Sequence, residues 1–496
     1  MKRRQFLNQT AIGAIGLSLP FSFNFTTKEE EFTFLLLKDW CDGMMRVQMH
    51  TPNDSTTDGA LDCPACKEEA DYMIHGRCLD AVYPFLYMAD KTDDQCYLEA
   101  GIKVFEWGEN VTMPDGSWTV VADPKTWKGI TIFGAIALAE TLHYHGHLLA
   151  EKRKVKWTDR LQRAADYCYK NIDMNFSNTN YSFTAVYGFW LLGHVLDNED
   201  YIAKSRFMAS QVYDFFTENH LIFGEGRPRE SKSGKGLPPV DLGYNVEESL
   251  GGLVQYALEA KDEKLLSLLD KSLMAHLQFM LPDGGWDNSW GTRQAKWTYW
   301  GSRTSDGCQV AYNLMAHRNP VFGLAARRNA ELLQRCTKDG LLHGGHGYIK
   351  AGVKPCVHHT FPHAKALTTI LNAKRPIAKY GDDVQLPISK AYGFKYVEDL
   401  DVFLVAVGNF RASISGYDFI YRNGVHATGG SLSLLYHLEM GLLAAGSMAK
   451  YVQIEKFNQQ ENKGEAYPLT PRIETYQDGV WYTNLYDLNA NLSASS

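Results

Sequence analysis

The stretch Ile130–Leu149, ITIFGAIALAETLHYHGHLL, is a long apolar segment with a single acidic residue. Asn245–Ala260, NVEESLGGLVQYALEA, is also poor in charge. Segments of this kind begin near residues 70, 127, 180, 245, 305 and 359. A helix that is apolar on nearly every side has to be buried. The recurrence predicts six helices that form the wall of a central barrel.

A second kind of helix, more charged and with apolar residues three and four positions apart, follows five of these segments. These predicted outer helices are Asp94–Trp107, Thr158–Ile172, Tyr201–Phe216, Glu263–Met280 and Val321–Cys336. The N-terminal segment Thr33–Met49 is the expected sixth partner, which closes the ring. The inner helices start roughly 53 to 65 residues apart, and a period of this length indicates a repeat architecture. We therefore predict an (α/α)6 toroid over residues 29–378.

Related turns follow the predicted outer helices. They are Pro114–Trp118, Gly224–Pro228, Pro282–Trp286 and Asp339–Gly345. Glycine supplies the positive φ angles that a chain leaving a helix needs, and Pro and Asp favour turns. Because all these turns lead to the N-terminal ends of inner helices, we expect their side chains to gather at one mouth of the barrel.

The pattern changes after about Pro387. Alternating apolar and polar residues predict strands of an antiparallel sheet, namely Val402–Val407, Ala412–Ile414, Phe419–Arg422, Ser431–His437 and Val480–Leu485. Asn423-Gly424 indicates a tight hairpin, and Leu432–Ala445 fits either a strand or a helix. With Lys374–Asp383 as linker, residues 379–496 are predicted to form a smaller β-sheet domain, so the whole chain is an α+β two-domain protein.

The composition limits the classes of function. At 496 residues, 45% hydrophobic and 22% charged, the chain can bury a large core. Its net charge is -7, and its one short basic run lies within Glu151–Lys156. Phosphate binding needs a basic face, so nucleic acid is not expected as a partner.

The first 28 residues resemble an export signal. Met1-Lys2-Arg3-Arg4-Gln5-Phe6-Leu7 precedes an apolar run that ends near Phe23, too short to span a bilayer. We expect a twin-arginine signal that is removed on export to the periplasm, with no membrane insertion afterwards. The alternative is a disordered leader on a cytoplasmic protein.

Nine cysteines are present, most of them at helical positions. Cys63-Pro64-Ala65-Cys66 is the exception, because two thiolates at this spacing can bind one zinc ion, and His75 and Cys78 follow closely. We predict Cys63, Cys66 and Cys78 as ligands of a structural zinc, with a disulfide as the alternative after export. His358, His359 and His363 are weaker candidates for metal ligands. No other cofactor is expected.

The segment Trp286–Asp306, WDNSWGTRQAKWTYWGSRTSD, is the richest in functional side chains. Aromatic faces stack on sugar rings, and guanidinium groups bind carboxylates through paired hydrogen bonds. This combination favours an acidic, plant-type glycan as substrate. The predicted substrate-binding residues are Trp118, Trp286, Trp290, Arg293, Trp297, Trp300, His346 and His359. The alternative is that the tryptophans pack the long loop against the barrel.

Two further groups are expected at the same mouth, His75 with Arg77 and Tyr244 with Asn245. Asn245 also fits a helix N-cap, because Glu248 follows three residues later. A toroid followed by a β-rich domain resembles the toroid-type polysaccharide lyases. Cys63–Cys66 followed by His75–Pro84, HGRCLDAVYP, is most similar to the L-rhamnose-α-1,4-D-glucuronate lyase family of gut Bacteroidetes. The resemblance implies a deep central pocket and a tyrosine base.

If the substrate is a uronate, a lyase removes the C5 proton and expels the group on O4. Positive groups must then neutralise the carboxylate, and a tyrosinate can take the proton. Tyr299 is the predicted base, because it lies between Arg293 and Arg303 in the sequence, and Tyr244 is the second choice. Arg77, His75 and Arg303 are the predicted carboxylate clamps, and Asn245 is a further donor.

Two other functions fit the same residues. The first is an (α/α)6 glycoside hydrolase that acts on uronate-containing oligosaccharides with a carboxylate acid and base, drawn from Asp115, Glu247, Asp287 and Asp306. The second is a glycan-binding protein without catalysis. The arginines and tyrosines of the long loop favour elimination.

Overall fold

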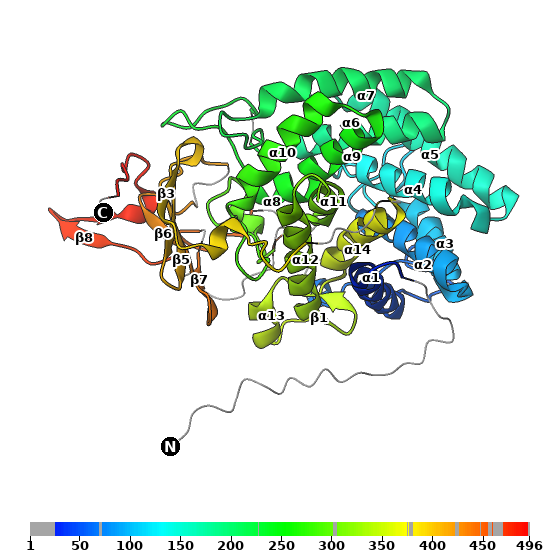
Figure 1. The fold of residues 1–496 in the computed structure, drawn as a ribbon. Coiled ribbons are helices and arrows are strands. Elements are labelled where there is room, and N and C mark those ends of the chain that lie inside the picture. The colour runs from blue at the N-terminus through cyan, green and yellow to red at the C-terminus, as the bar shows by residue number, and fades with distance from the viewer. Residues whose placement is uncertain are drawn as a thin grey trace.

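A computed structural model describes residues 25–68, 72–226, 228–300, 305–373, 375, 380–421, 426–446, 448–454, 459 and 470–494. Six inner helices form a ring within these ranges (Figure 1). They are α2 (Val82–Thr92), α4 (Thr131–His145), α6 (Thr179–Val195), α9 (Leu250–Ala260), α11 (Gln309–Leu314) and α14 (Val357–Asn372). Each contacts the next in this order, and α14 contacts α2, so the ring is closed.

An outer helix covers each inner helix. In ring order the outer helices are α3 (Gln95–Trp107), α5 (Glu151–Asn171), α7 (Glu199–Gln211), α10 (Glu263–Leu277), α12 (Pro320–Arg335) and α1 (Lys28–Arg46). The last of these, α1, packs on α14 and joins the two ends of the helical region. The predicted (α/α)6 toroid is therefore confirmed.

Local sequence explains where the outer helices begin. The side chains of Asp94, Asn198, Asp262 and Asn319 each accept a hydrogen bond from a backbone N–H in the first turn of the helix that follows. Two inner segments differ from the prediction near residues 70 and 305. A 3-10 helix, η2 (Gly76–Ala81), precedes α2, and α11 has only 6 residues.

The long connections after the outer helices share one local structure. Each begins with a short antiparallel pairing, such as Thr112 with Trp118 and Met280 with Trp286. The corresponding pair after α12 is β1 (Thr337–Lys338) with β2 (Leu341–Leu342). Gly116, Gly284 and Gly340 have positive φ in these turns, as the sequence predicted. A short helix, α13 (His346–Lys350), follows the last pairing.

The C-terminal part forms a five-stranded antiparallel sheet in the order β3-β4-β5-β6-β7. The strands are β3 (Gly393–Val397), β4 (Val402–Val407), β5 (Phe410–Ser415), β6 (Ser431–His437) and β7 (Gly441–Ala445). A separate hairpin pairs β8 (Glu474–Gln477) with β9 (Val480–Thr483). The segment left open between helix and strand is thus β6 and β7.

The predicted strand Phe419–Arg422 is wrong over the residues that can be assessed. Phe419 to Tyr421 form no strand, because the Phe419 ring turns toward the toroid, where it lies close to Gly226. Asn423-Gly424 and Arg422 lie outside the described residues. The boundary after residue 378 stays a prediction, since residues 376–379 also lie outside them.

The sheet lies beside the toroid and is hydrogen-bonded to its loops (Figure 1). Ser413 of β5 donates to Asp287, and the Val240 amide donates to the Tyr417 hydroxyl at 2.9 Å. The Lys235 ammonium contacts Asp401 at 2.6 Å. The first contact fixes the long loop after α10 against the sheet, and the other two fix the connection that precedes α8.

Residues 1–24, which carry most of the predicted export signal, lie outside the described part of the chain. Among the helices that are described, none combines the length and the apolar character that a membrane crossing requires.

Candidate active site

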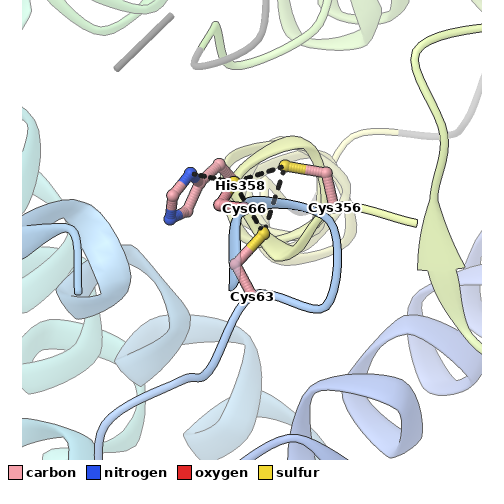
Figure 2. Close-up of side chains that lie close together, drawn as sticks. All are labelled: Cys63, Cys66, Cys356 and His358. Carbon is pink, nitrogen blue, oxygen red and sulfur yellow. Dashed lines mark hydrogen bonds between the residues drawn. The ribbon is translucent and has the colours of Figure 1, made fainter. Parts of the chain in front are cut away.

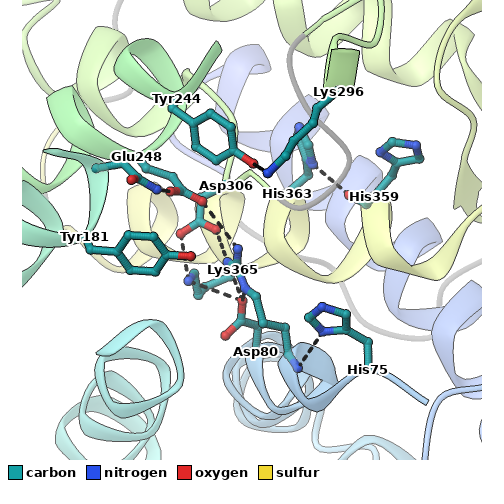
Figure 3. A network of polar contacts seen from close by, with 12 residues as sticks. His75, Asp80, Tyr181, Tyr244, Glu248, Lys296, Asp306, His359, His363 and Lys365 are labelled. Carbon is teal, nitrogen blue, oxygen red and sulfur yellow. Dashed lines mark hydrogen bonds and ion pairs between the residues drawn. The ribbon is translucent and has the colours of Figure 1, made fainter. Parts of the chain in front are cut away.

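The first turns of the inner helices and the segments just before them bring polar side chains to one region of the toroid (Figure 3). Arg77 and Asp80 come from η2, and Lys365 comes from α14. Glu248 belongs to a π-helical turn, η6 (Asn245–Ser249), that leads into α9. Asp306 lies just before α11. Four segments far apart in the sequence therefore supply one cluster.

Arg77 is the centre of a buried ion cluster. Its Nη2 contacts Asp80 at 2.7 Å and also pairs with Asp306, and its Nη1 lies 3.4 Å from Glu248. Lys365 pairs with Asp306 at 2.7 Å. Burial opposes the charge of Arg77, but Asp80, Asp306 and Glu248 together raise its pKa. The guanidinium that we predicted to bind a substrate carboxylate is thus engaged by carboxylates of the protein.

The cluster contains two cations, Arg77 and Lys365, and three carboxylates. Asp80 and Asp306 can balance the two positive charges, and Glu248 is then the third carboxylate. Burial raises the pKa of Glu248 to about 7. The Asn180 Nδ2 donates to the other Glu248 oxygen at 2.6 Å. Glu248 can therefore hold a proton near neutral pH, which limits the charge buried in the cluster.

A second group surrounds Tyr244, which is buried at the end of α8 (Leu242–Tyr244). The Lys296 ammonium donates to the Tyr244 hydroxyl at 3.1 Å. The Arg293 guanidinium carbon lies 3.9 Å from the centre of the Tyr244 ring, and its Nη1 donates to Glu225 at 3.2 Å. Two cations beside a phenol favour its ionised form.

Asp241 anchors this group. It accepts hydrogen bonds from the Tyr244 amide at 3.3 Å and from the Arg293 amide at 2.8 Å. Asp241 is therefore the N-cap that we predicted at Asn245. The Asn245 Nδ2 instead donates to the Ile222 carbonyl at 2.7 Å and lies 3.1 Å from His276 of outer helix α10, so its amide faces away from the cluster.

Tyr299 is bonded to a carboxylate. Its hydroxyl donates to Asp283, and both burial and the Asp283 charge raise the pKa of Tyr299. A phenol bonded to a carboxylate retains its proton, so this environment is opposite to the one a tyrosinate base needs. Arg303 lies outside the described residues.

Most of the predicted sugar-stacking tryptophans are core residues. Trp118, Trp286, Trp290 and Trp300 are at most 2% exposed. Trp118 packs under the Arg160 guanidinium, Trp286 against Tyr312, and Trp290 against Phe279 and Tyr417. Trp300 contacts the rings of His359 and His363. Trp297 alone of the five is half-buried, and its indole N–H donates to the Trp286 carbonyl at 2.9 Å.

The histidines near the cluster have structural contacts. His75 caps η2, since its Nδ1 accepts from the Arg77 amide at 3.1 Å. His363 Nδ1 lies 2.7 Å from the His359 carbonyl, and burial lowers the pKa of His363 to about 4, so it is neutral. His346 begins α13, and its side chain is not among those described.

A buried group of metal-binding side chains lies beside this region (Figure 2). It consists of Cys63, Cys66, Cys356 and His358, whose ligand atoms all lie within 4.8 Å of one another. The predicted third ligand, Cys78, is wrong, because its Sγ points to the Leu61 carbonyl at 3.8 Å. Burial raises the pKa of the Cys78 thiol to about 12. The Cys3His group can hold a metal ion.

Sequence reasoning missed several of these residues, although signals for some of them were present. His358 was among the weaker metal candidates, but Cys356 was missed, although Cys356-Val357-His358 is a second pair of metal-binding residues at short spacing. Lys296 and Glu225 lie inside the two loops that were singled out. Lys365 gave no signal, because its partners Asp80 and Asp306 are distant in sequence, whereas Asp80 lies only three residues after Arg77.

The fold places the chain among the (α/α)6 toroid proteins. A solved family 76 glycoside hydrolase from a bovine Bacteroides thetaiotaomicron strain is similar, with a TM-score of 0.50 and 11% identity. The match covers 69% of this chain and 78% of that one. At this identity the likeness shows the fold alone.

The sequence comparisons identify the family. Residues 37–389 match the ulvan lyase N-terminal domain, and residues 394–496 match the ulvan lyase C-terminal domain. The broad-specificity ulvan lyase of Formosa agariphila is 52% identical over 509 residues, covering 100% of this chain and 79% of that protein. The chain belongs to the ulvan lyase family, and it is a polysaccharide lyase, a carbon–oxygen lyase.

The comparisons also decide between the functions considered above. The predicted likeness to toroid-type polysaccharide lyases is confirmed, and the family that matches is that of the ulvan lyases. Elimination is therefore favoured over the hydrolase and over the glycan-binding protein without catalysis.

Replacing Arg77 by Leu tests the ion cluster. The variant leaves Asp80, Asp306 and Glu248 without their central cation, and we expect it to lose about 3–5 kcal/mol in free energy of unfolding. The measurement is chemical denaturation. Arg163→Leu is the control, because Arg163 pairs with Asp159 on the surface and its loss should cost less than about 1 kcal/mol. Equal stability of the two variants would contradict the structural role of Arg77.

Proposed function

We propose that this enzyme cleaves ulvan, an acidic sulfated algal polysaccharide, by β-elimination. The cleaved bond joins a sulfated rhamnose to O4 of a uronic acid, either glucuronate or iduronate. The product carries an unsaturated uronate at its new end. The observation that supports this proposal is the pairing of family membership with a buried tyrosine held between two cations.

Tyr244 is the proposed base. Its phenolate removes the proton from C5, the electrons of that bond form the C4–C5 double bond, and the C4–O4 bond breaks. The proton then passes to the departing oxygen, which leaves as the hydroxyl of the rhamnose. Lys296 donates to the Tyr244 hydroxyl and Arg293 stacks on its ring, and both contacts favour the phenolate that starts the reaction.

The carboxylate of the uronic acid gains negative charge as C5 is deprotonated, so it needs positive neighbours. Arg293 and Lys296 supply fixed positive charge at this position. Glu225, fully buried, accepts from Arg293 at 3.2 Å and accepts from the Asn180 amide at 2.8 Å. Burial raises the pKa of Glu225 to about 7. Glu225 therefore orients Arg293 without having to carry a full charge.

Tyr244→Phe and Tyr299→Phe form a matched pair that tests this assignment. We expect Tyr244→Phe to lower kcat on ulvan by about 100- to 10,000-fold, the usual contribution of a general base. Tyr299→Phe should keep kcat at saturating ulvan within a few fold of the unchanged enzyme, because its hydroxyl is bonded to Asp283 and is not proposed to act in the chemical step. The rate is followed by the ultraviolet absorbance of the unsaturated uronate. Full activity of Tyr244→Phe would exclude Tyr244, and products without this absorbance would exclude elimination.

We also propose that the Cys3His group binds a structural zinc ion. A tetrahedral zinc with three sulfur ligands and one nitrogen ligand sets the sulfur atoms roughly 3.8 Å apart and sulfur from nitrogen roughly 3.6 Å. Here the Sγ–Sγ distances are 3.0, 3.5 and 3.9 Å, and Cys66 Sγ lies 3.6 Å from His358 Nδ1. A disulfide needs about 2 Å between sulfurs and would use only two of the three thiols.

The zinc ion would join two distant parts of the chain. Cys63 and Cys66 lie in the connection before η2, and Cys356 and His358 lie at the start of α14. The His358 ring also contacts His75, which caps the helix that carries Arg77. The ion would thus hold the last inner helix against the segment that precedes the first one.

Metal analysis of the purified enzyme tests the zinc proposal. We expect about one zinc per chain, and Cys356→Ser should lower both the zinc content and the melting temperature, since a bound metal stabilises the folded state. Cys78→Ser is the control, because this thiol is buried nearby but points elsewhere, and it should keep its zinc. Unchanged zinc content in Cys356→Ser, or protein without metal and with a Cys63–Cys66 disulfide, would refute the assignment.

We propose export to the periplasm through the twin-arginine signal in residues 1–28. The support is the Arg3-Arg4 pair ahead of a short apolar run. Cell fractionation of a strain that makes the full chain, compared with an Arg3→Lys, Arg4→Lys variant, tests it. The unchanged chain should appear in the periplasm and the variant in the cytoplasm, and equal distribution of the two would contradict the proposal.

A further inference from the structure

A cavity of about 970 Å³ lies between the loops of the toroid and the sheet. Five aromatic side chains line it. They are Trp297, Tyr299, Tyr348, Tyr436 and Tyr451, which come from the long loop, α13, β6 and the segment after β7. Its volume is at the upper end of the range for ligand sites, roughly 300–1,000 Å³. The cavity is therefore large enough for more than one sugar ring.

The lining of this cavity suits an anionic sugar. Aromatic rings offer flat apolar faces, on which the C–H faces of a pyranose can pack. Arg335 and Lys350, both exposed, also line the cavity and can bind sulfate or carboxylate groups. Asp283 and Glu439 are the acidic residues of the same lining, and the Asp283 side chain is bonded to Tyr299. The Tyr299 hydroxyl is held by Asp283, which fixes one of the rings in place.

The cavity adjoins the proposed catalytic group through a single loop. Gln294, Ala295, Trp297 and Thr298 line the cavity. Lys296, in the middle of this run, points to the other side and donates to the Tyr244 hydroxyl. One loop therefore lines the cavity with some of its residues and contacts Tyr244 with another.

We propose that this cavity is an accessory subsite, which binds sugar residues of the ulvan chain at a distance from the cleaved bond. The inference rests on the proposed function, because it takes the occupant to be the substrate of the same enzyme. The sheet domain then contributes directly to substrate binding, through Tyr436 and Tyr451. Long substrates gain contacts that the shortest cleavable oligosaccharide lacks.

Tyr348→Ala and Lys350→Ala test the subsite, and Trp481→Ala on β9 is the control, because this ring is 69% exposed and lies outside the cavity. Kinetics are measured on ulvan and on the shortest oligosaccharide that the unchanged enzyme cleaves. We expect each cavity variant to raise KM for ulvan at least fivefold and to change kcat/KM on the short substrate less than twofold. The control should match the unchanged enzyme on both.

Each other outcome overturns the subsite. An equal loss on both substrates indicates a structural role for the cavity residues, and no change on either indicates that the cavity is empty during the reaction. Binding supplies a readout without turnover. Calorimetry of ulvan with Tyr244→Phe and with Tyr244→Phe, Lys350→Ala should show weaker affinity in the double variant. If the unchanged enzyme forms no unsaturated product, the proposed function fails instead, and the calorimetric comparison still decides the subsite.

Discussion

The buried ion cluster around Arg77 is the constraint on which the rest of this structure depends. Removing an ion from water costs several kcal/mol. Arg77 and Lys365 can therefore be buried only because carboxylates surround them, and these belong to Asp80, Asp306 and Glu248. The residues of the cluster come from four places, which are η2, the turn before α9, the segment before α11, and helix α14. Satisfying one cluster therefore fixes the positions of four inner segments. The same segments carry or flank His75, Tyr244, Trp300 and His359, so the cluster also fixes the surroundings of the proposed base, Tyr244.

The ring of helices could be predicted because its physical cause is local. An inner helix is covered on all sides and has to be apolar, whereas an outer helix alternates with period 3.6, and both patterns are visible in one segment at a time. The exceptions are of another kind. Helix α11 begins only at Gln309, after a loop, and Phe419 leaves the sheet because its ring packs toward Gly226, which is distant in sequence. In the sheet, β4 and β6 coincide with their predicted ranges, since alternation is equally local.

The site could be predicted only in part, because the composition of a loop does not show in which direction each side chain points. Tyr299 and Trp300 are adjacent, yet one faces Asp283 and the other faces His359 and His363. The long loop was singled out from its composition, and the structure places its Lys296, which the sequence analysis did not select, beside the Tyr244 hydroxyl. Likewise, Cys78 was chosen as a ligand because it is near Cys66 in sequence, whereas the side chain that approaches Cys66 is Cys356, 290 residues away. The sequence shows which residue types are present, but it does not show that the closed ring brings residues from its two ends into contact.

The separation of the metal-binding side chains has a consequence for the order of assembly. Cys63 and Cys66 leave the ribosome early, while Cys356 and His358 are made only after every other inner helix, so the full set of ligands cannot meet until the ring has closed. Closing a loop between residues so far apart in the chain costs conformational entropy. The docking of α14 must offset this cost before the ligands can meet. Uptake of an ion here would thus mark the closure of the helical ring, which an unfinished toroid cannot reach.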